Sequence, residues 1–125
     1  MSVKITVLVV EPEKAPYIKE IDPGLKSLQQ EVGGDIQAIY PFLEPAAIVC
    51  NESGKLDGLP LNRALRGEDG KAYDIIAGTF LVVGLGEEDF TSLSPELISQ
   101  FRQHFQRLET FLRINGSIVV MPFER

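Results

Sequence analysis

Hydrophobic and polar residues alternate with a period of two at the start of the chain. Val3, Ile5, Val7 and Val9 are separated by polar residues up to Thr6, and β-branched side chains dominate the segment. This pattern is typical of a strand with one buried face. A turn region with two prolines follows at residues 11–16, and residues 17–21 can return as a second strand at the edge of a sheet.

Two segments have the spacing of a helix. The first follows Asp22 and Pro23, which suit an N-cap and a first helical position, and ends at the two glycines 33–34. The second opens at Ser94 and Pro95 and is closed by the Asn-Gly pair at 115–116. Its apolar stripe predicts one long C-terminal helix and consists of Leu97, Phe101, Phe105, Leu108 and Leu112.

The remaining apolar runs predict further strands at 36–42, 46–50 and 117–123, and a short helix over 59–65 opened by Pro60. Residues 75–83 are apolar on both alternating faces, which favours a central strand covered on two sides. The expected fold is therefore α+β: a single domain over 1–125 with a mixed, largely antiparallel sheet. One long C-terminal helix and one shorter N-terminal helix are expected to pack on it.

Composition and charge limit the class of protein, its partners and its location in the cell. The chain has 125 residues, of which 44% are hydrophobic and 24% charged, as expected for a globular protein with one core. Its net charge of −6, with the basic residues scattered, argues against a nucleic-acid partner. A single cysteine, Cys50, ends an apolar run and is expected to be buried. The absence of a membrane-spanning run or signal sequence predicts a cytoplasmic protein with no membrane partner.

Polar groups interrupt the apolar segments in the middle of the chain. They are Asn51, the dipeptide Asn62-Arg63, and Thr79. Polar groups in such places must find partners, either in the fold or in a ligand. The guanidinium of Arg63 and the amide of Asn62 could clamp an anionic or amide-bearing ligand. In the alternative, Asn62 caps the short helix and Arg63 pairs with Asp74 or a surface glutamate.

The other chemical signals are weaker. Gly84-Leu85-Gly86 resembles part of a phosphate-binding loop, but three acidic residues follow it and favour an ordinary connection. One histidine, His104, and one cysteine do not make a metal site. We therefore expect no catalytic residue, no metal and no cofactor.

These central segments resemble a known family. The segments Asn51-Glu52-Ser53-Gly54-Lys55, Gly58 to Leu65 and Asp74 to Phe80, with shorter ones at 9–12, 40–42 and 89–93, are similar to domain of unknown function 3846. The resemblance implies a bacterial or phage protein, often on a mobile element near antirestriction and conjugation genes. No activity is established for the family. It draws attention to Asn51, Asn62, Arg63 and Thr79 as ligand-binding candidates.

Three functions are compatible with the sequence. The leading hypothesis is a small intracellular binding or accessory module of a mobile element, which recognises a protein partner or small ligand through those four residues. The second is an enzyme or nucleotide-processing domain in which Arg63 holds an anion and Asp74 or His104 moves a proton. The third is an acidic antirestriction-type protein that imitates DNA.

Overall fold

A six-stranded antiparallel sheet forms the body of the protein. The computed structural model describes residues 3–122. The order of five strands across the sheet is β2-β1-β7-β4-β3, and a short sixth strand, β8, pairs with the end of β7. Their bounds are β1 Ile5–Val10, β2 Tyr17–Ile21, β3 Ile36–Ile39, β4 Ala46–Asn51, β7 Phe80–Leu85 and β8 Phe90–Thr91.

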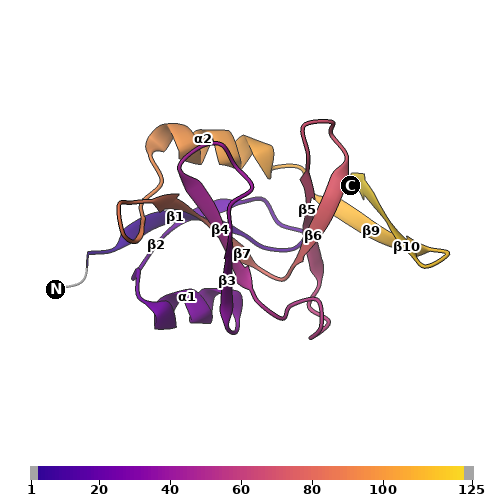
Figure 1. Ribbon diagram of the computed structural model, residues 1–125, viewed down its shortest axis with the longest axis horizontal. Helices are drawn as coiled ribbons and strands as arrows, with labels where there is room; N and C mark the ends of the chain where they lie inside the picture. The colour runs from indigo at the N-terminus through magenta and orange to yellow at the C-terminus, as the bar shows by residue number, and fades with distance from the viewer. Residues whose placement is uncertain (1–2, 123–125) are drawn as a thin grey trace.

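The two helices lie on opposite faces of this sheet (Figure 1). Helix α1, Leu25–Val32, packs on the face that carries Val7, Val49 and Leu81. Helix α2, Pro95–His104, packs on the opposite face, which is formed by the side chains that alternate with these along the same strands. Strands buried on both faces read as continuous apolar runs, which explains Ala46 to Cys50 and Phe80 to Val83.

Two antiparallel ribbons lie together at one end of the molecule (Figure 1). One pairs β5, Leu61–Arg66, with β6, Ala72–Ala77. The other is a hairpin of β9, Glu109–Ile114, and β10, Ser117–Pro122. Leu65 and Ile76 belong to the core under α2, so the first ribbon is attached to the body by apolar packing. The hairpin extends away from the body.

The predicted α+β class is confirmed. The strands near 3–9, 17–21 and 46–50 are present, and the second is at the edge of the sheet as expected. Every strand pairing among residues 3–122 is antiparallel, so the expectation of a mixed sheet was wrong. The third strand ends at Ile39, before Pro41, and Phe123 of the last predicted strand lies outside the described residues.

The prediction of one long C-terminal helix was wrong for the second half of that segment. Helix α2 starts as predicted, with the Ser94 hydroxyl accepting a hydrogen bond from the Leu97 N–H at 3.2 Å, but it ends at His104. Residues 109–114 form β9 instead. Asn115 and Gly116 have φ of 51° and 82°, so the pair taken as a helix end is the tight turn of the hairpin. Asn-Gly is the residue pair that such two-residue turns prefer.

The middle of the chain also differs from the expectation. Residues 61–65 of the short helix predicted at 59–65 belong to β5, and the predicted strand 75–83 is divided into β6 and β7 at Gly78, whose φ is 81°. Helix α1 has Gly24 as its N-cap. The Asp22 carboxylate accepts a hydrogen bond from the Gly24 N–H at 2.9 Å, so it stabilises the turn before the helix.

The end of α1 was predicted correctly. Gly33 has a φ of 79°, and its N–H donates to the carbonyl of Gln29 at 2.8 Å. This is the left-handed position at which glycine commonly ends a helix. Neither helix within residues 3–122 has the length and apolar character needed to cross a bilayer.

Substitution of Gly84 tests the packing of β8 on β7. A Cβ at Gly84 would lie 2.3 Å from the carbonyl oxygen of Ser92, which is backbone and cannot move aside cheaply. We expect Gly84→Ala to lower the free energy of unfolding by about 2 kcal/mol in urea denaturation followed by circular dichroism. Gly67→Ala is the control, because its nearest neighbour is the flexible end of Asp69, and it should change stability by less than about 0.5 kcal/mol. Equal effects of the two substitutions would contradict the close approach.

Candidate functional site

Asn62 and Arg63 lie side by side on β5, and both are buried, with 1% of each residue exposed. In the β5–β6 ribbon, Leu61 is opposite Ala77 and Arg63 is opposite Ile76, so Asn62 is an extra residue. Such a bulge interrupts the alternation of a strand and redirects side chains. It allows two successive polar side chains to point into the molecule.

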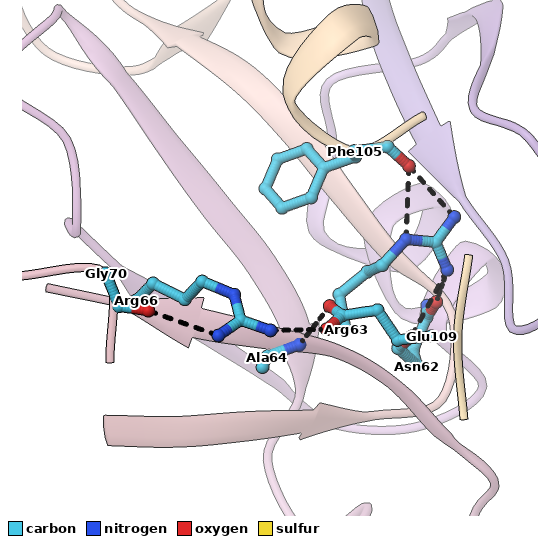
Figure 2. Close-up of polar contacts among 7 residues, drawn as sticks. All are labelled: Asn62, Arg63, Ala64, Arg66, Gly70, Phe105 and Glu109. Atoms are coloured by element: carbon cyan, nitrogen blue, oxygen red, sulfur yellow. Dashed lines mark hydrogen bonds and ion pairs between the residues drawn. The ribbon is translucent and has the colours of Figure 1, made fainter. Parts of the chain in front are cut away.

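All five N–H donors of Arg63 are used within the protein. Nε and Nη2 both donate to the carbonyl of Phe105, at 3.1 and 3.0 Å (Figure 2). Nη2 also donates to the carbonyl of Lys14 at 2.8 Å. Nη1 donates to the backbone oxygen of Asn62 at 3.2 Å and to its side-chain Oδ1 at 2.7 Å. A guanidinium has five donors in total, so none is left for a ligand in this arrangement.

Asn62 extends the same network. Its Nδ2 donates to the carbonyl of Val10 at 2.8 Å and to that of Gly78 at 2.9 Å. Together with Arg63 it therefore connects the end of β1, the turn after it, the turn between β6 and β7, and the end of α2. Every buried side-chain nitrogen and oxygen in the described part of the chain has a partner.

The charge of Arg63 is stabilised by backbone oxygens. Burial lowers the pKa of this guanidinium, and the charge of Glu109 acts in the opposite direction. Phe105 is the C-cap of α2, where the partial negative charge of the helix dipole attracts a cation. Glu109 itself accepts hydrogen bonds from the Ala64 N–H and from Arg66 Nη2, both at 2.9 Å (Figure 2). It thereby attaches β9 to β5.

The four residues predicted to bind a ligand do not line one common cavity. Asn51 lines a cleft of about 350 Å³, and its amide joins α1 to the turn after β4: Nδ2 donates to the Val32 carbonyl at 3.2 Å, and Oδ1 accepts from the Ser53 N–H at 2.9 Å. Thr79 lines a different cleft of about 300 Å³. Asn62 and Arg63 line none of the five clefts described within residues 3–122. Direct ligand contact by these four residues stays a prediction.

A cleft of about 460 Å³ lies where the two ribbons approach each other, and we call it the ribbon cleft. Its polar lining residues are Lys55, Tyr73, Asp74 and Arg113. The Lys55 ammonium is ion-paired with the Asp74 carboxylate, which also accepts the Ile75 N–H at 2.8 Å. Apolar side chains from the turn, β6 and the hairpin complete the walls.

The Lys55–Asp74 pair lines both the ribbon cleft and the cleft that contains Asn51. The pattern of the sequence singled out Asp74 as a partner of Arg63 or as a group that moves a proton, and gave no role to Lys55, Tyr73 or Arg113. These residues come from a turn, from β6 and from β9. No local spacing connects them, so only the tertiary structure brings them together.

The three residues of the enzyme hypothesis do not share any of the clefts described within residues 3–122. Asp74 lines the ribbon cleft, whereas Arg63 and His104 line none of the described clefts. The exposed ring of His104 lies edge-on to Phe105 and Phe42, with ring centroids 4.6 and 6.3 Å apart. Within residues 3–122, no three histidine, cysteine, aspartate or glutamate side chains gather as a set of metal ligands.

Cys50 is buried as predicted. Its thiol donates to the carbonyl of Gln37 at 3.6 Å, and burial raises its pKa. A raised pKa reduces the fraction of reactive thiolate at neutral pH. The thiol is thus a packing group of the core.

Substitution of Arg63 tests its structural role. Arg63→Ala removes five hydrogen bonds and leaves buried carbonyls without donors, so we expect a loss of about 3 kcal/mol or more in the free energy of unfolding. Arg102→Ala, on the exposed side of α2, is the control and should change stability by less than about 0.5 kcal/mol. The chain has no tryptophan, so unfolding is best followed by circular dichroism. A stability of Arg63→Ala equal to that of the control would contradict the role.

Comparison with known proteins places the chain in a family without an assigned activity. The sequence model of the family described as "Domain of unknown function (DUF3846)" matches residues 5–106. This range includes both helices and β1 to β8, and it ends before the hairpin. No curated protein and no solved structure matches the chain. The match covers most of the chain and includes the Asn62-Arg63 network up to Phe105. The protein therefore belongs to the DUF3846 family.

Proposed function

We propose that this protein is a small binding module that takes up a ligand in the ribbon cleft. The observation that carries the proposal is the cleft itself, whose volume of about 460 Å³ is within the roughly 300–1,000 Å³ of small-molecule sites. Apolar walls with a few convergent polar groups are the usual composition of such sites.

The charges of the cleft favour an anionic ligand. Lys55 and Arg113 are two cations against one carboxylate, Asp74, in a chain with a net charge of −6. Asp74 is already paired with Lys55, whereas the guanidinium of Arg113 makes no hydrogen bond or ion pair with any residue between 3 and 122. A guanidinium in this position suits a carboxylate, sulfonate or phosphate. The phenol ring of Tyr73 and the hairpin side chains Ile118 and Val120 suit an apolar or aromatic portion.

We favour binding over catalysis because the candidate reactive side chains already have partners within the protein. The carboxylate of Asp74 is held in an ion pair, and the donors of Arg63 are all used by the fold. In this proposal Asn62 and Arg63 hold β5 in place, and Asn51 shapes the neighbouring cleft. The expected cytoplasmic setting and the link to a mobile element, where the module would act as an accessory protein, are part of the proposal.

Anilinonaphthalene sulfonate is a suitable probe, because it combines aromatic rings with an anionic group. We expect it to bind with increased fluorescence, and we expect Arg113→Ala to weaken its binding about five-fold through loss of one charge-assisted contact. Chemical-shift changes in amide NMR spectra should map to residues 55–61, 72–75 and 113–120.

The matched control is Arg102→Ala, which removes an exposed arginine from α2. It should leave the affinity unchanged. Binding that is equally strong in Arg113→Ala, or shift changes that map to another part of the protein, would contradict the proposal.

A further inference from the structure

The β9–β10 hairpin has two faces of different character. Residues opposite each other in an antiparallel pair share a face. Arg113 is opposite Ile118, and Phe111 is opposite Val120, so these four share the inner face, which contributes to the ribbon cleft. The outer face consists of three cross-strand pairs: Ile114 with Ser117, Leu112 with Val119, and Thr110 with Met121.

The outer face is mostly apolar, and its apolar side chains are exposed to a large extent in the part of the chain that the structure describes. Leu112, Ile114, Val119 and Met121 are between 38% and 50% exposed, and no charged residue occurs on this face. Figure 1 shows the hairpin projecting from the end of the molecule. A two-stranded hairpin is at best marginally stable in water unless further strands or packing cover it. The attachment of Glu109 to β5 secures only its base.

We propose that two copies of this chain associate through the outer faces of their hairpins. Two observations favour a second copy as the occupant. The first is charge, because two molecules of net charge −6 repel each other least where the contact surface carries no charge. The second is the pairing of a large side chain with a small one at both ends of this face, Ile114 with Ser117 and Met121 with Thr110.

A two-fold axis can pair two such faces in either of two directions. With the hairpin tips together, Ile114 faces Ser117 of the second copy, and Met121 faces Thr110. With the tips apart, Ile114 faces Thr110, and Met121 faces Ser117. In both arrangements a large side chain meets a small one at each end of the face. At the centre, Leu112 meets Val119 with the tips together and a second Leu112 with the tips apart, so the first arrangement lets the two sheets interdigitate better at about 10 Å. The face is therefore complementary to itself, as a two-fold interface requires.

The size of the face determines how tight the association can be. A strand of six residues is about 20 Å long, so two hairpins bury less than the roughly 1,600 Å² of a standard interface. We expect a dimer that dissociates on dilution. Association would also stabilise the hairpin, whose inner face forms one wall of the ribbon cleft. This consequence rests on the proposed function, and it makes ligand binding and dimerisation mutually favourable.

Sedimentation velocity of the free protein tests the dimer independently of any ligand. From about 10 µM to about 1 mM, the wild type should shift from monomer to dimer. Val119→Lys places a charge at the centre of the face and should remain monomeric. Leu43→Lys, the same kind of change at a fully exposed leucine in the loop before β4, should dimerise like the wild type. A wild type that is monomeric at the highest concentration, with its outer face free for some other partner, would overturn the proposal, and so would dimerisation of Val119→Lys.

Amide NMR spectra of the wild type locate the interface without any substitution, so the test does not depend on whether Val119→Lys unfolds the hairpin. Shift changes between the two concentrations should be confined to residues 109–122. Changes centred elsewhere, for example on the edge strand β2, would overturn the proposal. In the same samples, anilinonaphthalene sulfonate should bind the wild type more tightly than Val119→Lys. Equal affinities with a confirmed dimer would remove the linkage, and the absence of any binding with a confirmed dimer would remove the proposed function but leave the dimer.

Discussion

The buried guanidinium of Arg63 is the interaction on which the arrangement of this protein depends. It connects the C-terminal end of α2, the turn after β1 and its neighbour Asn62 through five hydrogen bonds. No carboxylate takes part in these bonds. A buried charge without such partners would be strongly destabilising, so the carbonyl groups around it must be held in place by the rest of the fold.

The ribbons depend on this network for their position. Asn62 and Arg63 fix β5 to the sheet and to α2, and Glu109 then fixes the hairpin to β5 through the Ala64 N–H and Arg66. The position of the ribbon cleft depends on these hydrogen bonds, because its walls belong to the elements that they hold together. Its cation Arg113 belongs to the hairpin, and Lys55 and Asp74 belong to the turn and to β6. A scaffold of buried polar bonds thus positions a cleft whose own polar groups face solvent.

The sequence was sufficient to predict those elements that local chemistry determines. The Ser94-Pro95 start of α2, the glycine end of α1 and the doubly buried strands follow from capping and periodicity. The prediction failed where one pattern has two meanings. Leu108 and Leu112 continue a helical stripe, but Asn115-Gly116 makes a hairpin turn, and tertiary pairing selected the strand. The sequence did single out Asn62-Arg63 as an important pair. Its partners could not be predicted, because most of them are backbone carbonyl groups, which every residue carries.

The most direct test of the structural role of Arg63 is nitrogen-detected NMR of the arginine side chains in the intact protein. A guanidinium with five hydrogen bonds cannot rotate freely, so the Nη protons of Arg63 should give separate signals that exchange slowly with water, and those signals should not move when anilinonaphthalene sulfonate is added. Exposed side chains such as Arg102 should give averaged signals. An averaged Arg63 signal, or one that shifts with the ligand, would contradict the account.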